Sequence, residues 1–287
     1  MKNIPLITST QNKQIRIVCK LLNDRKTRKK EGLFVAEGYK VVSTLSLKSA
    51  ASEVVCAERF FKKHRSEIKF KKMVHGRDTH VSIVRDSIFN TFSSLTTSDG
   101  ILAVFRQLIF PLDDFTTMKR CVGVLCENIQ DPTNIGSIIR TCLCLGADAL
   151  FLTHDSVDIY NPKVVRASAG YLMHMPVHYI SLQEVALLIK KKMSLLVSDI
   201  KDTEKSKALS EIGAIPSRIM IAFGNEGRGI SRELYSIGNN YFYIPMDNEG
   251  ESLNINAAVA ITLFSIVPKV KTLFKVKGEN CAKKNYL

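Results

Sequence analysis

The sequence lacks several features that would assign it to a familiar class. Its longest apolar runs stop well short of the roughly 18 residues that a membrane span requires. The start, MKNIPLITSTQNKQ, has no apolar segment of the kind found in signal peptides, so we expect a cytoplasmic protein. Its seven cysteines form no CxxC pair, which argues against a disulfide framework and a zinc ribbon. Reduced thiols are therefore expected.

A glycine-rich loop is present, but it does not fit a phosphate-binding fingerprint. GNEGRGIS, residues 224–231, has glycines only at 224, 227 and 229 and follows the apolar run RIMIAF. Neither GxGxxG nor GxxxxGK[ST] matches this spacing. Glu226 also places a carboxylate where a pyrophosphate loop favours neutral or positive groups. The loop is thus predicted to hold a different ligand.

Negative charge is scarce in the first part of the chain. The formal net charge is +14, and residues 1–108 hold 21 Lys and Arg against 9 Asp and Glu, a net of +12. The remaining residues have 20 against 18, a net of +2. Such an imbalance favours a polyanionic partner, of which RNA or DNA is the commonest. A solubilising surface is the alternative.

The first part, residues 1–109, mixes short helix and strand patterns. NKQIRIVCKLL has apolar residues at helical spacing, and GLFVAEG and GILAVF are typical of strands. DRKTRKKEG is predicted to be a solvated loop that contacts phosphate, with a plain surface loop as the alternative. Its five cations are Arg25, Lys26, Arg28, Lys29 and Lys30. Residues 110–120 contain a proline and a charge reversal without periodicity, and we predict a linker there.

From residue 121 to 268, apolar strands alternate with helical stretches. This alternation predicts a parallel α/β sheet with helices on both faces. Ligands of such sheets bind at the carboxyl ends of the strands, so chemistry is expected in the loops after Glu127, Phe223 and Ile244. The predicted strands are CVGVLCE, ALFLT, MPVHYI, SLLVSD, RIMIAF and YFYIPM. The remaining residues, 269–287, form a basic tail that is expected to be disordered.

Two of these loops lead into helices. In ENIQDPTNIGSIIRTCLCLGAD the apolar spacing predicts an amphipathic helix that Thr133 or Asn134 caps and that ends at Gly146. Arg140 falls off the apolar stripe, and a solvated surface arginine is the plain alternative for it. In YIPMDNEGESLNINAAVAITLF, a structural helix cap is the alternative role of Ser252 or Asn254.

These segments, taken together with NPKVVRASAGYLMHMPV, resemble the motifs of the SpoU (TrmH) family of RNA ribose 2′-O-methyltransferases. ITSTQNKQIRIVCKLLNDRKTRKKEGLFVAEG resembles the family's N-terminal substrate-binding domain, which has a ribosomal L30e-like fold, and SDGILAVF resembles that domain's last strand. The resemblance covers nearly the whole chain apart from the tail. It implies a trefoil knot, bound S-adenosylmethionine, a homodimer and an RNA substrate.

The resemblance also implies roles for particular residues. Arg140 matches the essential arginine, and we favour a grip on the adjacent phosphate with stabilisation of developing negative charge over a role as a base, because a guanidinium gives up its proton only with difficulty. Glu226 is expected to orient Arg140. The implied catalytic residues are Arg140, Asn134, Glu226, Ser252 and Asn254. The implied cofactor-binding residues are Gly224, Asn225, Gly229, Ile244, Met246 and Leu253.

One position departs from the family pattern. Asn256 stands where the family usually has a serine, and its hydrogen-bonding group is expected to preserve activity. His174 and His178 lack the i, i+4 helical placement of a zinc pair, so both are expected to be structural and no metal is expected.

The separate basic first domain resembles the ribosomal RNA subgroup of the family, which implies ribosomal RNA, most of all 23S rRNA, as the substrate. A tRNA ribose methyltransferase and a non-catalytic RNA-binding or ribosome-assembly protein that retains the knotted fold are the alternatives.

Overall fold

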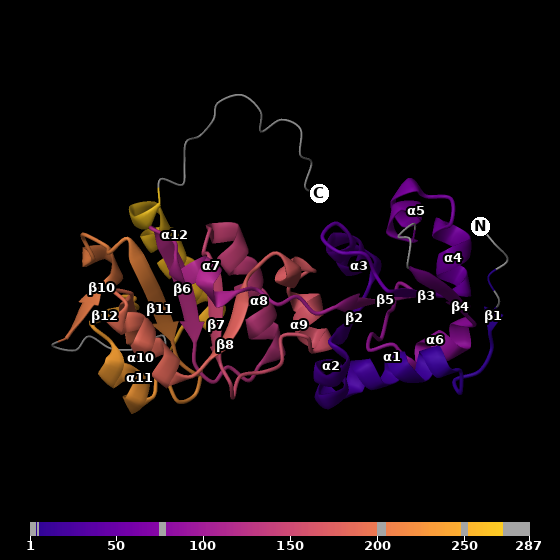
Figure 1. Cartoon of the computed structure of the whole chain (residues 1–287), viewed down its shortest axis with the longest axis horizontal. Helices are drawn as coiled ribbons and strands as arrows, with labels where there is room; N and C mark the ends of the chain where they lie inside the picture. The colour runs from indigo at the N-terminus through magenta and orange to yellow at the C-terminus, as the bar shows by residue number, and fades with distance from the viewer. Residues whose placement is uncertain (1–3, 5, 75–78, 200–204, 248–251, 272–287) are drawn as a thin grey trace, which may run out of the picture. The chain divides into compact units, whose positions relative to one another are not determined.

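The structure, a computed structural model, describes residues 4, 6–74, 79–199, 205–247 and 252–271. The chain forms two compact units. The first comprises residues 1–110, 129–140 and 156–176, and the second comprises residues 111–128, 141–155 and 177–287. Figure 1 labels the helices and strands of both units.

The first unit is built on a mixed five-stranded sheet in the order β1-β4-β3-β5-β2. β1, β4 and β3 run parallel, and β5 pairs antiparallel with both β3 and β2. β2 and β3 therefore end at the edge where β5 begins. The strands are β1 (Leu6–Ile7), β2 (Leu33–Glu37), β3 (Glu53–Ala57), β4 (His80–Val84) and β5 (Ile101–Arg106).

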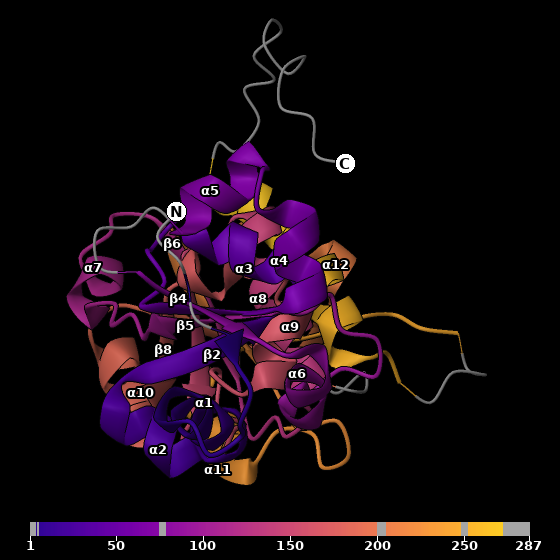
Figure 2. The same ribbon diagram turned by 90° about the vertical axis from the view of Figure 1, so that its right-hand side faces the viewer.

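Helices cover both faces of this sheet. α1 and α6 bury apolar side chains on one face, and α3, α4 and α5 lie on the other (Figures 1 and 2). α1 forms because Ile15, Val18 and Leu22 repeat at helical spacing behind the cap Asn12, whose side chain accepts from the amide of Gln14. The helices are α1 (Lys13–Asn23), α2 (Arg25–Glu31), α3 (Tyr39–Ser46), α4 (Glu58–His64), α5 (Ile68–Val74) and α6 (Asp86–Phe92).

The first unit also contains α9 (Pro162–Ala167) and the short 3-10 helix η1 (Tyr171–Met173), which come from a distant part of the chain. Tyr160, just before α9, packs its ring 4.8 Å from that of Phe34 in β2 and donates its hydroxyl to the carbonyl of Leu108. Gly170 adopts a φ of +85° close to Thr44 of α3. These contacts fix the segment around α9 on the N-terminal sheet.

The second unit has a seven-stranded sheet in the order β10-β12-β9-β11-β6-β7-β8, and every pairing in it is parallel. The parallel sheet predicted from the apolar strands is confirmed. The strands are β6 (Cys121–Cys126), β7 (Ala149–Thr153), β8 (Val177–Ile180), β9 (Ser194–Asp199), β10 (Ser206–Ala208), β11 (Arg218–Phe223) and β12 (Asn240–Tyr243).

Helices lie on both faces of this sheet as well. α7, α10 and α11 contribute to one apolar cluster, and α12 packs on the opposite face against β6 and β11 (Figures 1 and 2). The segment predicted as a linker contains α7, whose Phe115 is buried against Phe151. The helical elements are α7 (Leu112–Thr116), α10 (Leu182–Lys190), η2 (Leu209–Glu211), α11 (Arg232–Ile237) and α12 (Ile255–Val270).

α8 (Pro132–Leu145) contributes to both units, since the division falls after Arg140. α12 continues to Val270, and Lys271 pairs with Asp148 at 2.6 Å, so the first residues of the predicted tail belong to the fold. Residues 272–287 lie outside the described residues. No helix in the described part of the chain is long and apolar enough to span a membrane.

Candidate active site

The glycine-rich loop after β11 is closed by hydrogen bonds of its own backbone. The amide of Asn225 donates to the carbonyl of Gly229 at 2.9 Å, and the amide of Gly229 donates back at 2.8 Å. The Asn225 side chain accepts from the amides of Gly227 and Arg228 and donates to the carbonyl of Asn128 at 2.7 Å. Asn225 therefore shapes the loop and ties it to the end of β6.

Gly224 is required by the packing of this loop. A Cβ atom at residue 224 would lie 2.2 Å from the carbonyl carbon of Gly229 and 2.4 Å from the amide nitrogen of Ile230. Backbone atoms cannot yield to such a contact as a flexible side chain could, so only glycine fits. Gly229 itself has a φ of +68°, which favours glycine for a second reason.

A buried carboxylate anchors the far side of the loop. It is not among the site residues predicted from the sequence. Glu127, at the end of β6, accepts from the amide of Ser231 at 2.8 Å and from its hydroxyl at 2.6 Å. Ser231 in turn caps α11 through the amide of Leu234. The only sequence signal was an acidic residue directly after a buried strand.

A pocket of about 240 Å³ lies between this loop and the start of α12. It brings together seven of the predicted site residues: Gly224, Asn225, Glu226, Gly229, Ser252, Leu253 and Asn254. Ile244 and Met246 follow β12, and neither is among the described residues that line the pocket. Among the described residues, the lining contains no lysine or arginine and one carboxylate, that of Glu226. This chemistry suits a neutral or positively charged ligand better than a polyphosphate.

The structure decides which of the two candidates, Ser252 or Asn254, caps the helix that follows. Asn254 is the N-cap of α12, and its side chain accepts from the amide of Asn256 at 2.9 Å. Asn256, the departure from the family pattern, accepts from the hydroxyl of Thr141 at 2.7 Å. The amide side chain at this position thus joins α12 to the second half of α8.

Arg140 and Asn134 lie on α8, within the first unit. Arg140 is exposed, while Ile135, Ile138 and Ile139 are fully buried, as the amphipathic pattern predicts. The predicted cap is wrong. The helix begins at Pro132, and Asp131 accepts from the amide of Thr133 at 2.7 Å. Proline is favoured in the first helical turn because its missing N–H has no helical partner to lose.

The first half of α8 is seated directly on α9. A Cβ atom at Gly136 would lie 2.4 Å from that of Ala167 and 2.7 Å from the carbonyl oxygen of Val164. The two helices therefore meet through their backbones at this point. Since α9 is itself fixed on the N-terminal sheet, the helix turns that carry Asn134 and Arg140 have a rigid support within the first unit.

The basic segment 24–32 is a helix, and its prediction as a loop is wrong. The side chain of Asp24 caps α2 through the amides of Lys26 and Thr27, and Gly32 ends the helix with a φ of +63°. Arg25, Lys26, Lys29 and Lys30 are exposed, whereas the side chain of Arg28 is only 5% exposed.

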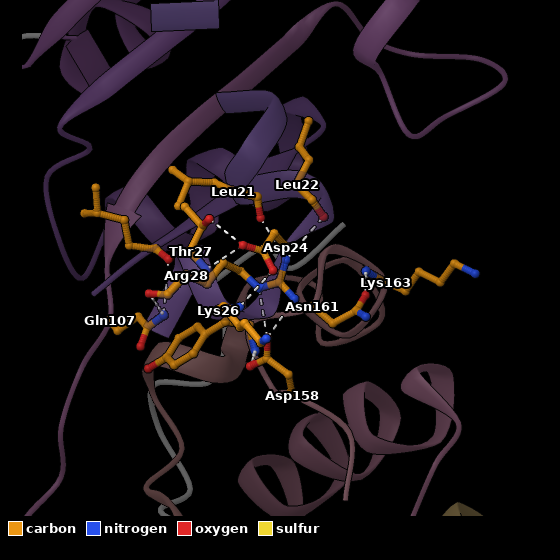
Figure 3. Close-up of polar contacts among 12 residues, drawn as sticks. Leu21, Leu22, Asp24, Lys26, Thr27, Arg28, Gln107, Asp158, Asn161 and Lys163 are labelled. Atoms are coloured by element: carbon orange, nitrogen blue, oxygen red, sulfur yellow. Dashed lines mark hydrogen bonds and ion pairs between the residues drawn. The ribbon is translucent and has the colours of Figure 1, made fainter. Parts of the chain in front are cut away.

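Figure 3 shows how Arg28 is held. Its Nε donates to Asp158 at 2.8 Å, and its Nη1 donates to the carbonyl oxygens of Leu21 and Leu22 at the end of α1. The guanidinium is fully engaged with the protein, so Arg28 is not part of the exposed basic surface.

The thiols around the site are buried and protonated. Burial, with a smaller contribution from the negative charge of Glu226, raises the pKa of Cys126, and burial likewise raises the pKa of Cys142. All six cysteines within the described ranges are free. His178 lies in β8 and stacks on Phe151 at 5.3 Å. The part of the chain that the structure describes contains no cluster of side chains arranged to hold a metal ion.

Comparison with known families assigns the class of this protein. Residues 122–264 match the SpoU rRNA Methylase family, and residues 12–103 match the MRM3-like substrate binding domain. The chain therefore belongs to the SpoU rRNA methylase family and carries an N-terminal substrate-binding domain. Members of the family are S-adenosylmethionine-dependent RNA methyltransferases, and the protein is an enzyme of this class with S-adenosylmethionine as its cofactor.

Individual relatives are distant but match along the chain. An uncharacterized tRNA/rRNA methyltransferase of Synechocystis is 27% identical, over 91% of this chain and 93% of its own. The 23S rRNA (guanosine(2553)-2′-O)-methyltransferase of Bacillus subtilis is 25% identical, over 91% and 98%. The structure of an AdoMet-bound rRNA methyltransferase from Sinorhizobium meliloti has the same fold, with a TM-score of 0.79, 22% identity and coverage of 93% and 99%.

Proposed function

We propose that the protein transfers a methyl group to a ribose 2′-hydroxyl of ribosomal RNA, in 23S rRNA. The observation that carries this proposal is the pocket at the carboxyl end of β11, where seven residues predicted from two separate motifs converge. Relatives from Bacillus subtilis and Streptomyces azureus are named as 23S rRNA 2′-O-methyltransferases, which supports both the reaction and the substrate.

The pocket suits the proposed cofactor. S-adenosylmethionine supplies an electrophilic methyl group on a positively charged sulfur, and the described lining residues include no cation that would repel that charge. The backbone of Gly224, Gly229 and Leu253 would hold the cofactor, and the carboxylate of Glu226 gives the pocket a compensating negative charge. Ile244 and Met246, at the end of β12, remain proposed contacts on the strength of the family resemblance alone.

The chain's own residues must orient the RNA and manage the negative charge that develops on the attacking oxygen. We assign the second task to Arg140, whose guanidinium offers paired donors to a phosphate. Asn134 lies on the same helix, near its start, and is proposed as a catalytic residue on the strength of the family resemblance. Ser252 and Asn254 are proposed to position the ribose or the loop. Asn254 contributes by capping α12, which fixes the backbone on which Ser252 and Leu253 depend.

We further infer that residues 1–109 bind the substrate, residues 110–120 join the domains and residues 121–268 form the methyltransferase domain, because the family matches at 12–103 and 122–264 fall inside these limits. The exposed cations of α2, namely Arg25, Lys26, Lys29 and Lys30, are proposed RNA contacts. The trefoil knot that the resemblance implies also remains a proposal.

A homodimer is proposed from the surface of α12. Phe264 is 73% exposed and Ile261 42% exposed, one turn apart on the same helix face, and Leu253 is 39% exposed just before the helix. Apolar surface of this kind on an otherwise packed helix marks an interaction site. Phe264→Glu is expected to convert a dimer into a monomer in sedimentation experiments, whereas an unchanged mass would contradict this interface.

The function is tested by methyl transfer from labelled S-adenosylmethionine to total bacterial RNA. Wild type, Arg140→Ala and Arg140→Lys are compared, with Arg232→Ala as a control for loss of another exposed arginine. Signal is mapped by its resistance to alkaline cleavage, which identifies a modified ribose. Activity on 23S rRNA that requires Arg140 supports the proposal, and full activity of Arg140→Lys would refute the paired-donor role. Cofactor binding without transfer to any RNA would indicate a non-catalytic binding protein, and signal only in tRNA would correct the substrate.

A further inference from the structure

A second pocket, of about 520 Å³, lies in the N-terminal unit, at the sheet edge where β2 and β3 end and β5 begins. We call it the α3–α4 pocket, because Tyr39 and Lys40 open α3 and Arg59, Phe60, Lys63 and His64 belong to α4. Asp99, just before β5, completes the lining. Its volume falls within the range of roughly 300–1,000 Å³ that is typical of small-ligand sites.

Positive charge dominates the lining. Lys40, Arg59 and Lys63 face a single carboxylate, that of Asp99, and this carboxylate accepts from the amide of Tyr39 at 2.9 Å. Lys40 and Lys63 are exposed. A concave surface with an excess of cations attracts an anion, and the commonest anions recognised by a basic domain are nucleic-acid phosphates.

Aromatic rings form the wall beside these cations. The ring of Tyr39 lies 5.2 Å from that of Phe60 and 4.9 Å from that of His64, and Phe60 and His64 stack at 4.3 Å. Phe60 is almost fully buried, so Tyr39 and His64 provide the ring surface toward solvent. Nζ of Lys69 lies over one face of the Tyr39 ring, 4.8 Å from its centroid. Flat rings next to cations are the combination with which proteins bind unpaired bases and their phosphates.

Glu67 holds the two outer rings in place. Its carboxylate accepts from the Tyr39 hydroxyl at 2.8 Å and contacts Nδ1 of His64 at 2.7 Å. Burial, assisted by the bond and the charge of Glu67, raises the pKa of Tyr39 to about 12, so the phenol remains a donor at neutral pH. The aromatic wall is therefore fixed before any ligand arrives.

A buried carboxylate fixes the chain segment that precedes Asp99, a residue of the pocket lining. Glu37, at the end of β2, accepts from the hydroxyls of Ser93, Ser94 and Ser98 and from the amide of Ser94. These bonds hold the loop that leads to Asp99. Arg59 donates to the carbonyl of Ser98 at 3.0 Å, which positions the guanidinium at the same edge.

We propose that the α3–α4 pocket binds a single unpaired nucleotide of the RNA, with its base against the rings of Tyr39 and His64 and its phosphates near Lys40 and Lys63. The proposal rests on the proposed function, since it supposes an RNA substrate. A duplex presents no free base face to these rings, so the pocket selects a loop, bulge or extruded nucleotide. It lies apart in sequence from α2 and from the residues assigned to chemistry.

The phosphate contact is tested by filter binding of the full chain to purified 23S rRNA over a range of salt concentrations. Lys40→Ala/Lys63→Ala is expected to reduce the slope of log Kd against log salt by about 1 for each lysine, roughly 2 in total. Lys190→Ala/Lys191→Ala removes two exposed lysines from the end of α10 and is expected to keep the wild-type slope. Equal slopes for the two double variants would overturn the proposal.

The base contact is tested with a single-stranded 12-nucleotide oligouridylate and the same oligomer carrying abasic sites. The wild type is expected to bind the first more tightly, and Tyr39→Leu to lose this preference by roughly 5- to 150-fold. Tyr39→Phe keeps the ring and is expected to retain it. No preference in the wild type would overturn the proposal. Failure of the wild type to methylate any RNA, with these binding results intact, would instead refute the proposed function alone.

Discussion

Replacing Arg28 by alanine is expected to destabilise the first unit strongly. The substitution leaves the Asp158 carboxylate, 14% exposed, without its cation and removes the donor that the carbonyl oxygens of Leu21 and Leu22 share. Breaking a buried ion pair from one side costs about 3–5 kcal/mol, because the remaining charge stays buried and unpaired. For a unit of about 140 residues this corresponds to a fall in Tm of roughly 9–15 °C.

The assay is urea unfolding followed by circular dichroism, with an exposed neighbour as the control. Arg25→Ala lies on the same helix and is expected to change the free energy of unfolding by less than about 0.5 kcal/mol. Arg28→Met combined with Asp158→Leu is expected to be less destabilised than Arg28→Ala, because no charge is left unpaired. Together with the single variants Arg28→Met and Asp158→Leu, the double variant completes a cycle that measures the coupling energy of the pair.

The same substitution is expected to reach the active site. Asp158 belongs to the segment that leads into α9, on which the first half of α8 rests. Loosening this support is expected to lower kcat for methyl transfer while leaving S-adenosylmethionine affinity unchanged. A loss of stability below about 1 kcal/mol, or an unchanged kcat, would refute the view that Arg28 supports the helix of Arg140.

Three further outcomes are expected. Gly224→Ala forces a Cβ atom into the backbone of the loop and should raise the Kd of S-adenosylmethionine in calorimetry at least about tenfold; Gly227→Ala, whose Cβ would meet only a side-chain oxygen at 3.6 Å, should bind as the wild type does. Asn256→Ser should cost about 1 kcal/mol in thermal unfolding through the weakened bond to Thr141, yet retain methyl transfer; an inactive variant would show that the amide is needed for chemistry. Burial lowers the pKa of His178, so the unfolded chain binds a proton at this residue more readily than the folded chain, and the free energy of unfolding should fall as the pH drops below about 6.5. His178→Gln should make that fall shallower in unfolding experiments over a range of pH. An identical slope would contradict a role of His178 in the pH dependence.

Hydrophobic patterning was sufficient to predict most elements of the fold. β6, β7 and β11 are predominantly apolar runs, and α8 has the spacing of an amphipathic helix, so each was recognisable from local sequence. α2 was missed because its exposed surface leaves almost no apolar periodicity. Its helix signals are a cap residue at Asp24 and a glycine at 32, whereas the run of charged residues between them is typical of a solvated loop.

The site was predictable in its location but not in its internal bonding. Parallel strands end at one edge, so the loops after β6 and β11 could be expected to meet there. The bond from Asn225 to Asn128 and the bonds from Ser231 to Glu127 join residues about 100 positions apart, and no local pattern reports them. The roles of Asn254 and Arg28 likewise depend on their tertiary neighbours.

The closed form of the loop around Asn225 has a consequence for the kinetics of cofactor binding. Its side-chain amide and the paired backbone bonds to Gly229 fix the loop's shape through contacts within the protein itself. Little conformational entropy then remains to be lost on association, and no slow rearrangement of this segment has to precede it. Stopped-flow traces should accordingly show a single phase whose rate rises linearly with cofactor concentration, without a plateau.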